Sequence, residues 1–116
     1  MKLTLGEIET WVGQTLPEPY RGFLGRQEQS LSVSDVVLIY GREAFVERNE
    51  TFRVKPYCPG FVAVGDDSGG YEILLSLADG RLGLVEQGSM FLDMIHPLAD
   101  DFATWFAAGC PLLDDY

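Results

Sequence analysis

The chain is poor in the side chains that carry most metal and redox chemistry. Its only histidine is His96, and its two cysteines, Cys58 and Cys110, lie far apart and lack CxxC spacing. Because a zinc site needs four tetrahedral ligands and no local pair supplies two, we predict no metal site. The cysteines are expected to be reduced thiols in or near the core rather than a disulfide framework.

The sequence also lacks a long apolar run and any nucleotide-binding glycine motif. Near the start, Thr4, Glu7 and Glu9 interrupt the apolar residues. We therefore expect neither a secretory signal nor a membrane span, and a cytoplasmic location. There is no Gly-x-x-x-x-Gly-Lys loop and no Gly-x-Gly-x-x-Gly motif after a strand, so no cofactor is predicted.

Basic residues are few as well. Eight Lys and Arg face eighteen Asp and Glu, which gives a formal net charge of −10. A charge of this sign disfavours binding to nucleic acid or to an anionic membrane, and it favours a basic protein partner. Solubility alone is the competing explanation for this charge.

What the sequence does contain is enough apolar material for one core. At 116 residues and 47% hydrophobic composition, residues 1–116 fit a single domain that needs no metal or disulfide to fold. There is no internal repeat, no low-complexity segment and no plausible linker. One domain is the economical interpretation.

Local patterns predict helices near both ends and strands between them. Thr4 and Glu7 have capping-box spacing ahead of an apolar stripe, which predicts a helix from about Leu5 to Gly13. Pro19 suits the first turn of a second, short helix. The remaining predictions are strands over 36–40, 53–55, 61–64, 71–77 and 82–87, a polar helix over 42–49, and a C-terminal helix that contains Leu98, Phe102, Trp105 and Phe106.

These elements favour an α+β fold. The Asp79-Gly80 pair predicts a hairpin with a type I′ turn, and alternating βαβ units are missing. We therefore expect a twisted, mostly antiparallel sheet with helices packed on it, including the N-terminal and C-terminal helices. The predicted core residues are Leu16, Phe23, Phe61, Leu74, Phe102 and Phe106.

One segment superficially suggests a protease. The sequence Gly65-Asp66-Asp67-Ser68-Gly69-Gly70 resembles the nucleophile loop of trypsin-like enzymes, but a serine nucleophile needs a histidine base oriented by a third group. His96 is the only histidine and immediately precedes a proline, so we predict a simple glycine turn and no catalytic residues. Asp66, Asp67, Asp100 and Asp101 would have to converge to hold a cation, and a solvated acidic rim is favoured.

Several short motifs together resemble the SUKH superfamily. Leu16-Pro17 and Tyr20-x-x-Phe23-Leu24 follow the first predicted helix. Further along come a Pro-Gly turn, a strand that ends in Gly-Asp, a glycine-rich loop and a closing Ala-x-x-Phe helix. The residues that match are Pro59, Gly60, Phe61, Gly65, Asp66, Gly69, Gly70, Ala99, Phe102 and Phe106. The chain departs from the pattern at 25–29, where an Asn-Gly-Gly turn is usual.

The resemblance implies a small α+β domain and a binding function. SUKH proteins are related to the yeast Smi/Knr cell-wall regulators, and many bacterial members are immunity proteins. We therefore expect a non-catalytic domain that binds and neutralises a toxin effector, such as a basic nuclease, through Asp66, Asp67, Tyr71 and Glu72. Exposed tyrosines, including Tyr40 and Tyr116, would add to such a surface. The alternatives are a regulatory or scaffold module and, third, an enzyme or small-molecule binder that uses the 66–70 loop.

Overall fold

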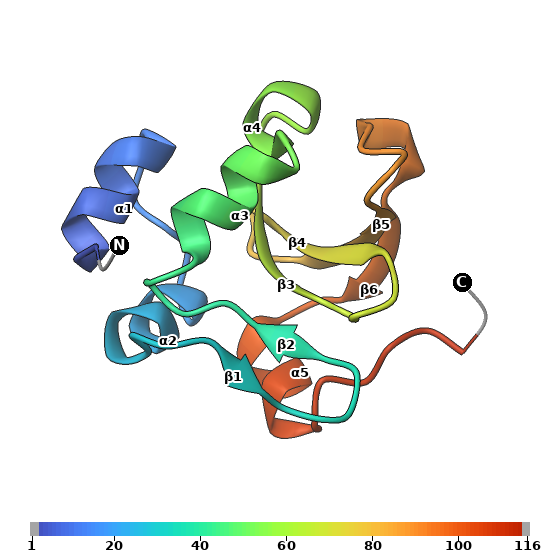
Figure 1. Ribbon diagram of the computed structural model, residues 1–116. Coiled ribbons are helices and arrows are strands. Elements are labelled where there is room, and N and C mark those ends of the chain that lie inside the picture. The colour runs from blue at the N-terminus through green and yellow to red at the C-terminus, as the bar shows by residue number, and fades with distance from the viewer. Residues whose placement is uncertain (1–2, 115–116) are drawn as a thin grey trace.

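A sheet of six antiparallel strands forms the centre of the structure (Figure 1). The computed structural model describes residues 3–114, and the strands follow one another across the sheet in chain order. They are β1 (Leu31–Ser32), β2 (Leu38–Ile39), β3 (Phe61–Asp66), β4 (Tyr71–Ser76), β5 (Leu82–Glu86) and β6 (His96–Ala99). The sheet is open, and with its helices it confirms the predicted α+β class.

Five α-helices and one 3₁₀ turn accompany the sheet in the described part of the chain. They are α1 (Leu5–Val12), α2 (Tyr20–Arg26), α3 (Phe45–Thr51), α4 (Val54–Tyr57), η1 (Leu92–Met94) and α5 (Phe102–Ala107). The Thr4–Glu7 capping box at the start of α1 is present as predicted. No helix among residues 3–114 is long and apolar enough to cross a membrane.

Most side chains of the central strands are apolar, and they pack against other parts of the chain on both faces of the sheet. One face carries Val62, Ile73 and Leu84, and it packs against residues of α1, α2 and α5 in the larger core cluster. The opposite face carries Ala63, Leu74 and Val85, which form a smaller cluster with Tyr40, Val54, Cys58 and Met90. Strands buried on both sides need this kind of near-continuous apolar sequence.

The core prediction is confirmed in outline. Leu16, Leu74 and Phe102 are buried, and Phe23, Phe61 and Phe106 are half-buried. The rings of Phe23 and Phe102 have centroids 5.1 Å apart in a tilted arrangement. Aromatic pairs at such separations stabilise a core beyond their buried area.

One predicted strand is wrong. Residues 53–55 were expected to form an edge strand, but Val54–Tyr57 is helix α4, and Arg53 has a left-handed backbone with φ 54°. Val54 and Cys58 are both buried in the smaller cluster, and the Cys58 amide donates to the Val54 carbonyl at 2.7 Å. This helical turn places both side chains in the core. The free energy gained by burying them exceeds the local preference for a strand.

The C-terminal region contains a strand that the sequence pattern did not predict. Leu98 belongs to β6 rather than to the last helix, and α5 begins after Asp101, whose carboxylate accepts a hydrogen bond from the Thr104 amide at 2.8 Å. Pro97 lies opposite Gly83 in the register between β6 and β5. A proline is tolerated there because β6 is an edge strand.

Three further predictions need smaller corrections. The strand expected over 36–40 is only Leu38–Ile39, and the helix expected over 42–49 is Phe45–Thr51. The β4–β5 hairpin is present, but its turn is not type I′, because Gly80 has φ +77° while Asp79 is not among the positive-φ residues. Asp79 instead accepts a hydrogen bond from the Arg81 amide at 3.1 Å.

The two cysteines agree with the prediction of reduced thiols. Cys58 and Cys110 are both free and both buried. Burial raises the pKa of both thiols, that of Cys110 to about 11. A thiol with a raised pKa carries little of the reactive thiolate at neutral pH.

Candidate functional site

The loop between β3 and β4 is built by its own carboxylates. Asp67 Oδ1 accepts hydrogen bonds from the amides of Gly69 at 2.8 Å and Tyr71 at 3.0 Å. Asp66 Oδ1 accepts from the Ser68 amide at 2.9 Å. Ser68 and Gly70 both have positive φ, which fits the predicted glycine turn.

The structure therefore uses the predicted site residues differently from what the sequence suggested. Asp66 and Tyr71 are half-buried, whereas Asp67 is 6% exposed and Glu72 is 0% exposed. The expectation that Asp67 and Glu72 present carboxylates at the surface is wrong. Glu72 shares a sheet face with Leu74, because alternate residues of a strand point the same way, and that face is covered.

Glu72 lies in a buried polar network at one end of the smaller cluster. The Tyr40 hydroxyl is 2.7 Å from Glu72 Oε1 and 2.9 Å from Asp66 Oδ2. Gln87 Nε2 donates to Glu72 Oε2 at 2.6 Å. Tyr40 is fully buried, so the expectation that its side chain lies at the surface is also wrong, and Tyr116 lies outside the described residues.

Burial changes the acid–base properties of this network. Desolvation raises the pKa of Glu72 to about 7, with a further contribution from Asp66, while hydrogen bonds from Tyr40 and Gln87 oppose the shift. Desolvation and the neighbouring Glu72 also raise the pKa of Tyr40 far above its usual value. The carboxyl group of Glu72 thus titrates near neutral pH.

Helix α3 is fixed to the sheet beside this network. Asn49 Nδ2 donates to the Ala63 carbonyl at 3.0 Å, and the Ala63 amide donates to Asn49 Oδ1 at 2.7 Å. The Asn49 side chain therefore takes the place of a neighbouring strand at this point of β3. On the same helix, Arg48 donates to Glu47 at 2.8 Å, and its guanidinium lies over the Phe52 ring.

Most of the large apolar side chains that are exposed in the described part of the chain lie elsewhere, on α4 and at η1. Four large side chains there are between 44% and 54% exposed, and we call this group the Phe91 patch: Tyr57, Phe91, Leu92 and Met94. The rings of Tyr57 and Phe91 contact each other edge to face, with centroids 6.0 Å apart. A cavity of about 340 Å³ opens beside them and is lined by Gln87 and Met90, among others.

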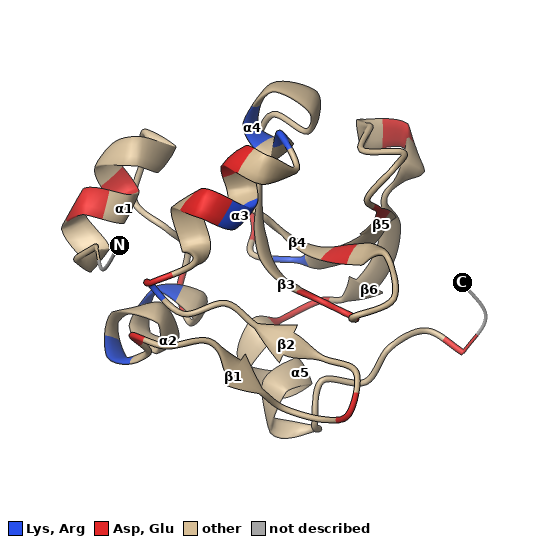
Figure 2. Cartoon of the chain, in the orientation of Figure 1, with Lys and Arg blue, Asp and Glu red and all other residues tan. Residues whose placement is uncertain are grey.

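The charge around the Phe91 patch is mixed, although the molecule as a whole is acidic. Asp93 is exposed within η1, and Arg53 lines the cavity. Figure 2 shows acidic residues spread over α1, α3, the end of β3 and η1, with fewer basic residues between them. The segment Phe91-Leu92-Asp93-Met94 has three apolar residues that fit neither a helical nor a strand period. This is the sequence signal that could have indicated the patch.

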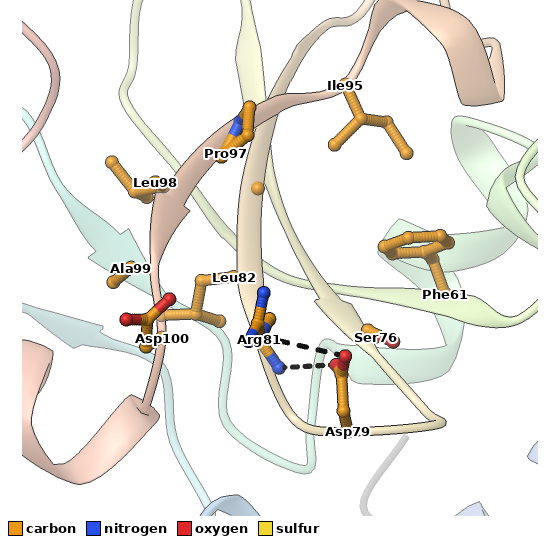
Figure 3. Close-up of a pocket in the computed structure, with 11 residues that line it drawn as sticks. Phe61, Ser76, Asp79, Arg81, Leu82, Ile95, Pro97, Leu98, Ala99 and Asp100 are labelled. Carbon is orange, nitrogen blue, oxygen red and sulfur yellow. Dashed lines mark hydrogen bonds and ion pairs between the residues drawn. The ribbon is translucent and has the colours of Figure 1, made fainter.

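A second hollow lies along β5 and β6 (Figure 3). It has a volume of about 420 Å³, with Ile95 and Pro97 toward one end and Asp79 and Arg81 toward the other. Arg81 Nε and Asp79 Oδ2 are 3.8 Å apart and largely exposed. These two charges pair with each other, so neither of them is free to bind a ligand in this hollow.

The other residues considered for chemistry are dispersed. Ser68 lies in the β3–β4 loop and His96 on β6, with β5 between β4 and β6. Asp66 ends β3 and Asp100 follows β6, and these two strands run in opposite directions. Within residues 3–114, no three His, Cys, Asp or Glu side chains are grouped so that they could hold a metal ion.

Comparison with family models and with curated proteins identifies no relative. No family model matches the chain, and no curated protein matches it. What the fold itself defines is an α+β domain with an open antiparallel sheet. The resemblance to the SUKH superfamily stays a prediction.

Proposed function

We propose that this chain is a non-catalytic domain that binds a basic protein partner through the Phe91 patch. The observation that carries the proposal is the concentration of exposed apolar side chains. Four of the five large hydrophobic residues that are exposed in the described part of the chain belong to this patch. Single exposed apolar residues are common on protein surfaces, whereas exposed apolar residues that contact one another, as Tyr57 and Phe91 do, mark a contact site.

The composition of the patch favours a protein over a small molecule. Tyr57, Phe91 and Met94 are of the residue types that are enriched at the centres of protein interfaces, because they bury a large area at low cost in polar desolvation. The neighbouring cavity, with a volume of about 340 Å³, is large enough to admit one side chain of a partner. A partner residue inserted there would contact Met90 and Phe91.

The net charge supports a basic partner. A formal charge of −10 creates a long-range field that accelerates the encounter with a positively charged protein. The apolar patch would then supply the short-range contacts that slow dissociation. Charge and patch thus act at different stages of binding.

The resemblance to SUKH immunity proteins suggests a narrower form of this proposal. In that form the partner is a bacterial toxin domain, such as a basic nuclease, and the chain neutralises it. A regulatory or scaffold role, as in the Smi/Knr proteins, is the alternative. A toxin gene next to the gene for this chain would favour the first, and an isolated gene would favour the second.

A capture experiment with matched variants tests the proposal. The tagged wild-type chain, a Phe91→Ser/Leu92→Ser variant and a Val36→Ser variant are each incubated with lysate of the source organism, and bound proteins are identified by mass spectrometry. Val36 is 47% exposed and lies outside the patch, so it controls for loss of an exposed apolar side chain.

We expect the wild type and the Val36→Ser variant to capture the same protein of high isoelectric point, and the patch variant to lose it. Circular dichroism first establishes that all three chains fold. Equal capture by the patch variant, or an acidic captured protein, contradicts the proposal.

A further inference from the structure

The Tyr40 hydroxyl lies between two carboxyl groups but has a single proton to donate. Its oxygen is 2.7 Å from Glu72 Oε1 and 2.9 Å from Asp66 Oδ2. Ionised carboxylates only accept hydrogen bonds. If both were ionised, one hydroxyl proton would have to serve two anions.

The other hydrogen-bond donors of these two carboxyl groups bind the oxygens that do not face Tyr40. Gln87 Nε2 donates to the second oxygen of Glu72, Oε2, and the Ser68 amide donates to the second oxygen of Asp66, Oδ1. The contacts at Glu72 Oε1 and Asp66 Oδ2 therefore still depend on the Tyr40 hydroxyl. One additional proton in the cluster would make both contacts full hydrogen bonds.

We propose that Tyr40, Asp66 and Glu72 form a proton-binding site, in which a protonated Glu72 donates to the Tyr40 oxygen and the Tyr40 hydroxyl donates to Asp66. Glu72 is the member that holds the proton, because its side chain is 0% exposed while Asp66 is half-buried. A buried carboxyl group is less costly in its neutral form.

The surrounding charges agree with this assignment. From β3, the nearby Asp66 carboxylate disfavours a second negative charge, and from α3 the Arg48 guanidinium opposes that effect. Arg48, however, donates its hydrogen bonds to Glu47. It therefore acts on Glu72 only at a distance.

Two other polar groups on this face of the sheet are uncharged at neutral pH. Gln87 is neutral, and Cys58, which follows α4 in the same cluster, has a pKa that burial raises. Burial likewise raises the pKa of Glu72 to about 7. The site thus exchanges its proton with solvent near neutral pH, and its loss leaves two adjacent carboxylates that share one hydroxyl.

The consequence is that Glu72 contributes less to the stability of the fold as the pH rises toward neutrality. The folded-state pKa of Glu72, about 7, lies above the ordinary value of 4.5. Between these two values the folded chain holds a proton that the unfolded chain has released, so the contribution of Glu72 falls as the pH increases across this window. This direction is opposite to that of a salt-bridged carboxylate.

A Glu72→Gln variant tests the proposal because an amide reproduces the protonated carboxyl group. Its NH₂ group can donate to Tyr40, and its carbonyl can accept from Gln87. The unfolding equilibrium constants of the wild type and the variant are measured in urea at pH 5 and pH 8. Glu86→Gln makes the same chemical change at an exposed position of β5 and serves as the control.

We expect the ratio of the wild-type unfolding constant to that of Glu72→Gln to rise on the order of 50-fold between pH 5 and pH 8. The corresponding ratio for Glu86→Gln should stay nearly constant. A ratio for Glu72→Gln that also stays constant overturns the proposal.

A second measurement on the wild-type chain decides the question even where the variant does not fold. The Cδ chemical shift of Glu72 is followed by NMR as the pH is varied. A titration midpoint between pH 6 and pH 8 supports the proton-binding site. A midpoint below pH 5 shows that both carboxylates are ionised at neutral pH and overturns it.

Discussion

Removing the Asn49 side chain should destabilise the fold more than a substitution of any exposed residue of α3. Asn49 is buried and bonds to both backbone groups of Ala63, at 2.7 Å and 3.0 Å. In an Asn49→Ala variant these two buried groups of β3 lose their side-chain partner. Each buried backbone group that is left without a hydrogen-bond partner costs about 1–3 kcal/mol, so we expect a loss of about 4 kcal/mol in the free energy of unfolding.

Urea denaturation followed by circular dichroism measures this loss. With a slope of about 2 kcal/mol per molar urea, the midpoint should fall by roughly 2 M. Glu50→Ala changes the next, exposed residue of α3 and should alter stability by less than about 0.5 kcal/mol. A loss below about 1 kcal/mol for Asn49→Ala would refute the view that this side chain replaces a strand partner.

Two further predictions concern the sheet and the absence of catalysis. A Cβ atom at Gly65 would lie 2.4 Å from a carbonyl oxygen of β2, so Gly65→Ala should lower the free energy of unfolding, measured in urea, by more than about 2 kcal/mol. A Cβ atom at Gly69 would have no neighbour closer than 3.6 Å, so Gly69→Ala should lower it by less than about 1 kcal/mol. Equal losses for the two variants would contradict the steric argument. Ser68→Ala and His96→Ala should each leave capture of the protein partner unchanged, because neither residue has the partners that nucleophilic catalysis requires. A hydrolase activity of the purified chain that either variant abolishes would refute the binding-only proposal.

Local sequence patterns predicted the elements whose causes are local. The Thr4–Glu7 capping box sets the start of α1, and the run of apolar residues around the 66–70 turn defines β3 and β4. The wrong predictions concern segments whose conformation depends on packing against distant parts of the chain. Arg53 adopts a left-handed backbone because α4 must bury Val54, and no neighbouring residue signals this.

The candidate sites show the same division. The 66–70 turn was recognisable from its Asp and Gly residues, but the burial of Glu72 depends on Tyr40 and Gln87, which come from segments beside β2 and β5. The Phe91 patch depends on how η1 meets α4, a contact that joins Tyr57 to Phe91. Such contacts between distant parts of the chain have no periodic signature in one sequence.

The central claim is that the Phe91 patch binds a basic protein, and binding kinetics test it most directly. Surface plasmon resonance compares the captured partner on the wild type, Phe91→Ser/Leu92→Ser and Val36→Ser chains at low and physiological salt. We predict that the patch variant raises the Kd by at least about 30-fold, mainly through faster dissociation, and that salt slows association in all three chains. An unchanged Kd for the patch variant would contradict the claim.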